Sequence, residues 1–249
     1  MPTVSIKVLP DSILRLEIDG RVYGFNPMTE EHTRAEADAD LLFVLESGEL
    51  KHGVDPTQPS GETYELENGI KLLRKPSAEI WCSRSFKEHL EQRIADARAG
   101  RCRFPGQKEF YSSLAGKVHW LHPQHVLVHE DVSLRLFDFT PQPLFPARKS
   151  GVLISLGDKN LLVANGSACE GDYTGAAVPP VELLILDPDV PKEQATRLVD
   201  FIRFLRPTKL FLKPRLAGKK LHAELTEALK TRAQGLELIR QKALQLTLP

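Results

Sequence analysis

The sequence predicts an α/β (α+β) chain in which one domain, residues 1–249, is built from two similar halves, about 1–117 and 118–249. Residues 12–27 and 150–167 each read as two extended runs joined at a tight turn, and both pairs are followed by further strands and a helix. The chain has 249 residues, 41% hydrophobic and 27% charged, which is enough to bury a large core in one domain.

The first half opens with apolar residues that alternate with polar ones, a pattern typical of strands with one buried face. Asp19-Gly20 supplies the positive φ values that a two-residue hairpin turn needs. The apolar run 41–45 is too short for a typical helix and predicts a strand buried on both faces. Residues 46–76 are rich in Gly, Pro and charge, and predict an inserted loop with a second hairpin over 63–73.

Two helices are predicted in the same half. The acidic stretch 29–40 is interpreted as one of them. A strand over 78–82 precedes the other, whose first turn carries the capping-box residues Ser85 and Glu88 and which ends near 99–100.

The second half repeats that order around the hairpin at 151–164. An apolar face at helical spacing predicts a helix that begins near Pro191 and ends before Pro207. Leucines at the same spacing predict a last, amphipathic helix over 218–244. Further strands are predicted over 118–120, 125–128, 132–139, 181–186 and 209–212.

The most specific pattern in the chain is S-G-V-L-I-S-L-G-D-K-N-L-L-V-A-N-G, followed by V-E-L-L-I-L-D-P and R-P-T-K-L-F-L-K-P. This order is similar to the region of the metallo-β-lactamase family where a hairpin precedes a bridging-aspartate loop and a later strand leads to the last metal histidine. The resemblance implies a four-layer αββα sandwich, with two mixed β-sheets flanked by helices. It also implies a centre where histidines and aspartates hold zinc, manganese or iron, and where the metal makes a hydroxide nucleophile.

Other residues stand at the family's ligand positions. Its H-x-H-x-D-H loop should follow the first buried strand, but residues 46–52 have no histidine at either leading position. The family's P-G-H would fall near 140–143, which has no histidine. Asn165 stands for the bridging aspartate, Lys213 for the final histidine and Asn26 for an early aspartate. The sequence therefore predicts a metal-free, catalytically degenerate relative, without cofactor, that binds a protein partner or an anionic small molecule.

Basic residues are expected around the rim where active relatives hold metal. Cations in that place could hold a phosphate or carboxylate, with loop amides as further donors. The candidate anion-binding residues are Lys213, Arg215, Arg148, Lys149, Asn165, Gly166 and Ser167.

Two alternatives stay open. A hydrolase of esters, lactones or phosphoesters could hold zinc, manganese or iron at a rearranged site made of Glu46, Glu49, His52 and Asp55. A nucleic-acid-binding protein could use the basic C-terminal segment, although few aromatic residues there could stack on bases. The basic residues of that segment are Lys219, Lys220, Lys230, Arg232, Arg240 and Lys242.

Cys169 and four histidines that neighbour one another in sequence are interpreted as structural residues without a catalytic or metal-binding role. Cys169, in the loop after the second hairpin, is expected to be an inert small residue, since no base or cation is visible beside it. The clustered histidines are expected on strands and a turn, where their side chains diverge. These histidines are His119, His122, His125 and His129.

The overall charge sets limits on partners. Lys+Arg and Asp+Glu are both 33, so no global field draws the chain to nucleic acid or to an anionic membrane. No signal-peptide pattern and no membrane-span-length apolar stretch stand out, which predicts a cytoplasmic protein. The 3 cysteines lack paired spacing, so no disulfide framework is expected. A homo-oligomer is left open.

Overall fold

The computed structural model describes most of the chain. The described residues are 3–8, 14–27, 38–45, 61–102, 104–122, 125–138, 150–171, 173–174, 177–187, 195–213, 227, 229, 236–239 and 243–247. Among them, no helix is both long enough and apolar enough to cross a membrane.

Most strands of the first sheet come from the N-terminal half. They are β1 (Thr3–Val8), β2 (Leu14–Ile18), β3 (Arg21–Phe25), β4 (Ala39–Val44), β5 (Arg74–Cys82), β6 (Val118–Trp120) and the C-terminal β14 (Ala243–Thr247). The strand order is β14-β1-β2-β3-β4-β5-β6. The strand predicted at 118–120 is therefore present and hydrogen bonds to β5 of the first sheet.

The second sheet repeats this arrangement in the order β13-β12-β11-β10-β9-β8-β7. Its strands are β7 (Val126–His129), β8 (Val132–Asp138), β9 (Ser150–Leu156), β10 (Lys159–Asn165), β11 (Leu183–Asp187), β12 (Lys209–Leu212) and β13 (Glu237–Ile239). The hairpins β2–β3 and β9–β10 are antiparallel, and the strands beyond them, β4 to β6 and β11 to β13, add in parallel. The two sheets thus have matching topologies, although β6 and β14, from the predicted second half, belong to the first sheet.

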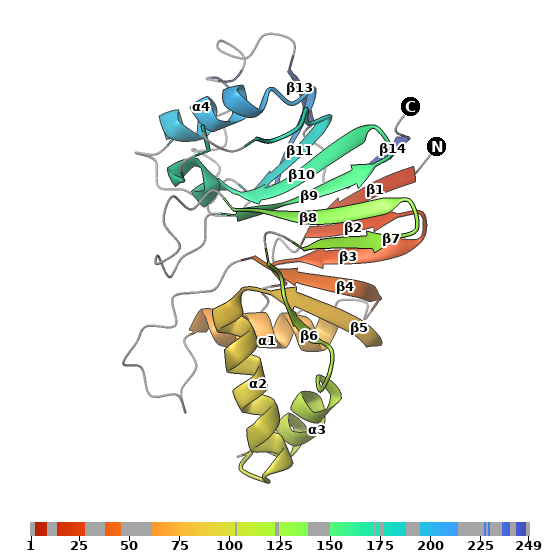
Figure 1. Cartoon of the computed structure of the whole chain (residues 1–249), viewed down its shortest axis with the longest axis vertical. Coiled ribbons are helices and arrows are strands. Elements are labelled where there is room, and N and C mark those ends of the chain that lie inside the picture. Colours follow the sequence, from red (N-terminus) through yellow and green to blue (C-terminus); the bar gives the residue numbers. More distant parts are fainter. Residues whose placement is uncertain are drawn as a thin grey trace.

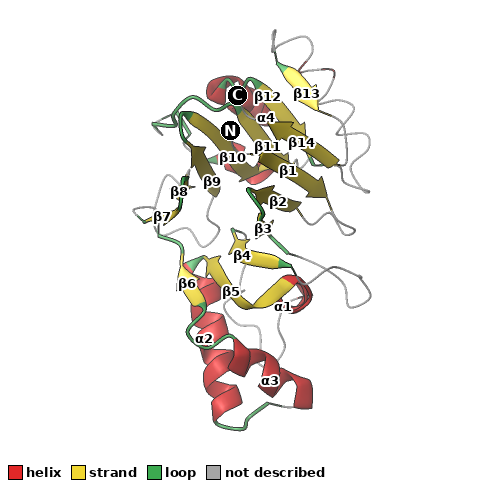
Figure 2. Cartoon of the chain, turned by 90° about the vertical axis from the view of Figure 1, so that its right-hand side faces the viewer, coloured by secondary structure: helices red, strands yellow, loops and turns green. Residues whose placement is uncertain are grey.

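Helices cover the outer face of each sheet, so the four-layer αββα sandwich is confirmed (Figure 1). The first sheet carries α1 (Gly61–Leu73), α2 (Arg84–Arg98) and α3 (Pro105–Ser113), which gather beyond β5 and β6 in Figure 2. The second sheet carries α4 (Ala195–Leu205). Three apolar clusters fill the spaces: one between the sheets and one under each helix layer.

The hairpin turn at Asp19-Gly20 forms as predicted. The φ angles are +49° at Asp19 and +81° at Gly20, the left-handed conformations that this tight turn requires. Alternate residues of β2, Leu14, Leu16 and Ile18, face the core between the sheets. Local turn chemistry and period-two patterning together fix this hairpin.

The hairpin predicted at 63–73 is wrong, because these residues form helix α1. Leu66, Ile70 and Leu73 recur at helical spacing and are buried under the first sheet. A Cβ atom at Gly69 would lie 1.4 Å from the carbonyl oxygen of Pro27, so only glycine allows this close approach. Residues 46–60 of the predicted inserted loop lie outside the described residues.

The helix predicted over 218–244 agrees with the described residues 227 and 229, which are helical, but is wrong from residue 237 on. Residues 237–239 and 243–247 are strands β13 and β14, which pair with β12 and β1. Leu244 and Leu246 stand two apart, opposite Ile6 and Val4 of β1, so sheet pairing overrides the helical spacing of the leucines. The basic residues at 219–220, 230, 232, 240 and 242 lie outside the described residues.

The predicted helix at 29–40 falls largely on residues outside the described ranges, and β4 begins within it at Ala39. Helix α2 is present, but its N-cap is Ser83 instead of the predicted Ser85. The Ser83 hydroxyl accepts a hydrogen bond from the backbone N–H of Phe86 at 3.3 Å.

This capping assignment makes a prediction. Ser83→Ala is expected to lower the free energy of unfolding by about 1 kcal/mol, because a free N–H at the helix start loses its acceptor. Ser85→Ala, inside the first turn, is the matched control. It should change the free energy of unfolding by only a few tenths of the loss expected for Ser83→Ala. Urea unfolding compares the two; equal losses would mean that Ser83 is not the cap.

Candidate functional site

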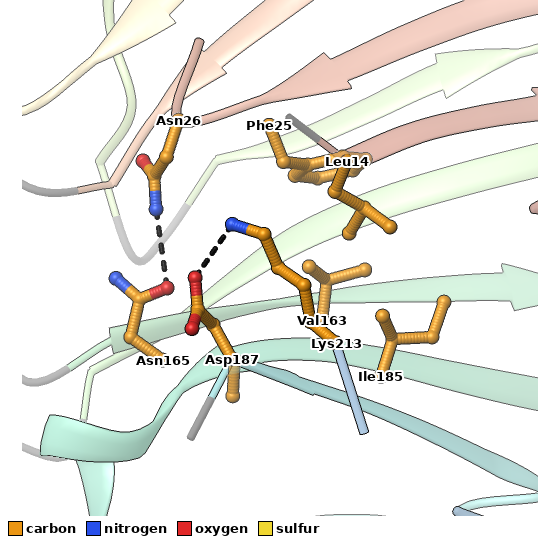
Figure 3. Close-up of a pocket in the computed structure, with 9 residues that line it drawn as sticks. Leu14, Phe25, Asn26, Val163, Asn165, Ile185, Asp187 and Lys213 are labelled. Atoms are coloured by element: carbon orange, nitrogen blue, oxygen red, sulfur yellow. Dashed lines mark hydrogen bonds and ion pairs between the residues drawn. The ribbon is translucent and has the colours of Figure 1, made fainter. Parts of the chain in front are cut away.

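Four polar residues meet where strands of the two sheets end. Asn26 follows β3 of the first sheet, Asn165 and Asp187 end β10 and β11, and Lys213 follows β12. Asn165 is paired in register with Asp187, and the backbone N–H of Lys213 donates to Leu186 O at 2.9 Å. The parallel pairing of β10, β11 and β12 therefore places three of these side chains at one edge of the second sheet (Figure 3).

Asn26 joins the two sheets. Its φ angle is +43°, a left-handed conformation that Asn tolerates better than most residues. Its backbone N–H donates to Phe43 O at 2.8 Å, and its side-chain Oδ1 accepts from the N–H of Leu45 at 2.7 Å. That bond fixes the orientation of the amide, so Nδ2 donates to Asn165 Oδ1 at 3.1 Å. One carboxamide thus connects the ends of β3, β4 and β10.

Lys213 and Asp187 form a buried ion pair. The ammonium Nζ donates to Asp187 Oδ2 at 2.6 Å, and the two residues are only 7% and 9% exposed. Bringing two charges out of water costs several kcal/mol per ion, and the close contact between the two offsets part of that cost. The pair is therefore a fixed feature of this edge rather than an occasional surface contact.

These residues line a small pocket between the sheets, whose interior of about 10 Å³ is close to what one water molecule needs. Its floor is apolar, and Figure 3 shows Leu14 and Phe25 from the first sheet facing the side chain of Lys213. The lining residues are Leu14, Phe25, Asn26, Val163, Ala164, Asn165, Ile185, Asp187 and Lys213.

The structure brings together only part of the predicted anion site. Asn165 and Lys213 both line the pocket, although Figure 3 shows Nδ2 of Asn165 directed away from Lys213. Gly166 and Ser167 open a short 3-10 helix, Gly166–Glu170, directly after Asn165. Three candidates, Arg148, Lys149 and Arg215, lie outside the described residues.

The described residues of this centre do not fit a zinc, manganese or iron ion. Protein sites for these metals use imidazole, thiolate or free carboxylate ligands, whereas the pocket offers two neutral carboxamides and one carboxylate bound to an ammonium. Across the described ranges, no three His, Cys, Asp or Glu side chains are grouped as a metal would require. The alternative ligands Glu46, Glu49, His52 and Asp55 lie outside those ranges.

Asp187 is the site residue that the sequence analysis missed. It appears only as the end of the run V-E-L-L-I-L-D-P, although its position carries a signal. A carboxylate that directly ends a wholly buried parallel strand lies at the edge where ligands of open α/β sheets bind. Its pairing with Lys213 joins residues 26 positions apart, which no local pattern shows.

Two of the three cysteines, Cys82 and Cys169, are buried, and Cys102 is half-buried. Burial raises the pKa of the Cys82 thiol to about 12, so it stays protonated at neutral pH. Cys169 is 2% exposed and packs in the apolar cluster under α4, as expected of a structural residue.

The predicted histidines lie on strands and a turn, but they do not all diverge. His119 stacks on Trp81 with ring centroids 4.6 Å apart, and the rings of His122 and His125 are 5.3 Å apart. Burial is the main cause that lowers the pKa of His129, which keeps that imidazole neutral.

A second buried polar cluster ties the outer helices together. The carboxylate of Glu67 in α1, 5% exposed, lies 2.7 Å from His89 Nε2 of α2 and accepts a 2.7 Å hydrogen bond from Tyr111 OH of α3. Burial, and then the Glu67 carboxylate, raise the pKa of Tyr111 far above its usual range. The cluster holds α1 in place, and α1 in turn contacts Pro27 beside Asn26 through Gly69.

Comparison with solved structures identifies the fold. The chain is similar to the metallo-β-lactamase fold protein YhfI from Bacillus subtilis, with a TM-score of 0.59 and 11% identity over 99% of both chains. It is also similar to Igni18, a metallo hydrolase from the archaeon Ignicoccus hospitalis, with a TM-score of 0.56 and 11% identity, covering 99% of this chain and 100% of that one. A third similar structure is Zn²⁺-bound PqqB from Methylobacterium extorquens, with a TM-score of 0.51 and 14% identity, covering 95% of this chain and 86% of that one.

No family model matches the chain, and no curated protein sequence matches it significantly. At these identities the likeness concerns the path of the backbone and leaves the chemistry of the centre to be argued from the residues themselves. The fold that the sequence predicted is confirmed.

Proposed function

We propose that this chain, which has the metallo-β-lactamase fold, is a metal-independent binding protein that holds an anionic small molecule on Lys213. The observation that carries the proposal is the buried Lys213–Asp187 ion pair at the strand end where the resemblance puts the last metal histidine. A fixed ammonium repels a divalent cation and attracts an oxyanion, so it reverses the preference of a metal centre.

The pocket around the ammonium supports binding rather than hydrolysis. Among the described residues, its other polar side chains besides Asp187 are Asn26 and Asn165, which donate and accept hydrogen bonds but do not take a proton from water at neutral pH. Asp187, the one carboxylate among the described lining residues, already accepts a 2.6 Å hydrogen bond from Lys213.

The test is an anion-dependent rise in melting temperature, measured with phosphate, sulfate and acetate on protein stripped of metal. The wild-type protein is expected to be stabilised, because an anion that binds only the folded state shifts unfolding by mass action. The double variant Lys213→Met/Asp187→Leu, which removes both charges together, should lose that rise. Lys209→Met, at the start of the strand that Lys213 follows and with a partly exposed side chain, is the matched control and should keep the rise. An unchanged rise in the double variant would sink the proposal.

A metal-dependent hydrolase is the second candidate function. The likeness to Igni18 and to Zn²⁺-bound PqqB favours it at the level of the fold. In this chain it would need ligands from Glu46, Glu49, His52 and Asp55 in the segment after β4, because the described pocket residues do not suit a metal. Metal content, taken up at the end of the Discussion, separates it from the first candidate.

A further inference from the structure

We infer that the pocket beside Lys213 is a site for a single atom: it holds one water molecule on the ammonium, and a bound anion replaces that water with one of its oxygens. The part about the anion rests on the proposed function, whereas the water site stands without it. Three features of the described residues carry the inference: spare donors on Lys213, acceptors beside them, and the size of the pocket.

The ammonium of Lys213 has donors to spare. A lysine ammonium carries three N–H groups, and among the described residues only Asp187 accepts one of them. Because Lys213 is 7% exposed, bulk water reaches the remaining donors poorly. A buried donor without an acceptor is unfavourable, so an acceptor held inside the pocket stabilises the folded chain.

Acceptors for the hydrogens of a water molecule lie beside the same ammonium. Asp187 Oδ2 is 2.6 Å from Nζ, and Figure 3 shows Asn165 next to Asp187, with its Oδ1 directed toward Asn26. Carboxylate and carboxamide oxygens each accept more than one hydrogen bond, so both can accept from a water in addition to their present donors. An internal water typically makes about three hydrogen bonds, which one ammonium and two such oxygens supply.

The pocket has room for one water molecule. Its interior of about 10 Å³ is at the lower end of what a water needs. The apolar side chains that line it are packed against their neighbours, since Leu14, Phe25, Val163 and Ile185 are only between 1% and 4% exposed. An anion can therefore reach the ammonium with one oxygen, while the rest of the anion stays outside the pocket.

The charge balance also suits a neutral occupant. The described lining residues include one cation and one anion, so their formal charge is zero. A water molecule enters such a site without bringing a net charge out of solvent, whereas an anion must give up part of its hydration. Water is thus the resident molecule, and an anion has to displace it.

Magnetic relaxation dispersion of water oxygen-17, which counts long-lived internal waters in solution, tests the inference on metal-stripped protein. The wild type is expected to hold about one such water more than the double variant Lys213→Met/Asp187→Leu, because an apolar cavity stays dry. Lys209→Met is the matched control and should keep the wild-type count. Saturation of the wild type with whichever of phosphate, sulfate and acetate raises the melting temperature most should lower its count by about one.

A crystal structure of the wild type, grown without added anions, is a second measurement that needs no variant. It is expected to show a water within hydrogen-bonding distance of Lys213 Nζ.

The possible outcomes separate the inference from the proposed function. Equal counts in the wild type and the double variant, with no water on Nζ in the crystal, would overturn the inference and leave the proposed function standing. A wild-type count that stays constant while the anion raises the melting temperature would overturn the replacement of water by the anion. If no anion raises the melting temperature, the proposed function fails, and the water count alone decides on the internal water.

Discussion

Lys213→Ala is expected to lower the free energy of unfolding by about 3–5 kcal/mol, because it removes the ammonium from its buried ion pair with the Asp187 carboxylate. Urea unfolding of the wild type and the variant at neutral pH measures the loss. The effect should exceed that of most single substitutions, since both members of the pair are almost wholly buried.

Two controls separate the ion pair from the mere loss of a lysine. Lys209→Ala, at the start of the strand that Lys213 follows, breaks a 3.8 Å contact with the exposed Glu237 and should cost under about 1 kcal/mol. Lys213→Met/Asp187→Leu removes both charges and should be close to the wild type or more stable. A Lys213→Ala loss no larger than that of Lys209→Ala would show that the buried pair is not formed in solution.

Gly69→Ala is the second large effect. A Cβ atom there would lie 1.4 Å from the carbonyl oxygen of Pro27, so α1 must move off the segment that follows β3. The cost of this overpacking is expected to be about 2–3 kcal/mol, even though alanine favours the helix by up to about 1 kcal/mol. Chemical denaturation measures the change.

The matched control for this substitution is Gly106→Ala in α3, where no atom lies within 4 Å of the new Cβ position. It should be neutral or stabilise the protein slightly. Because Pro27 adjoins Asn26, the Gly69 variant should also weaken anion binding, whereas Gly106→Ala should leave it unchanged. Similar stabilities of the two variants would contradict the close packing of α1 on Pro27.

The parts of the fold that the sequence predicts well are those set by local chemistry. Asp19-Gly20 specifies its turn by φ alone, and the alternation of Leu14, Leu16 and Ile18 specifies the buried face of β2. The apolar run at 181–186 predicts a strand covered on both faces, and the structure agrees, because all residues of β11 are buried.

The errors occur where distant contacts decide. In α1, Gly69 and the neighbouring charged residues have the composition of a loop. Leu66, Ile70 and Leu73 form a buried apolar face only because the helix packs on the first sheet. Residues 243–247 become a strand because β1 offers an edge on which they pair. Sequence periodicity contains no information about which edge is available.

The site was predicted in part for the same reason. Lys213 and Asn165 could be found, because the resemblance marks the strand ends at which they stand. The contacts that define the centre cross the fold: Asn26 to Asn165 over 139 positions and Lys213 to Asp187 over 26. Only the packing of one sheet on the other reveals them.

Metal content tests most directly whether this centre works without metal. Untagged protein is purified without chelator, and a second portion is exposed to manganese, iron and zinc in turn and freed of excess before mass spectrometry. The expected result is far less than one metal ion per chain in every sample, unchanged in the variant Glu46→Ala/His52→Ala. Near-stoichiometric metal that is lost in this variant would contradict the proposed binding protein and support a hydrolase with relocated ligands.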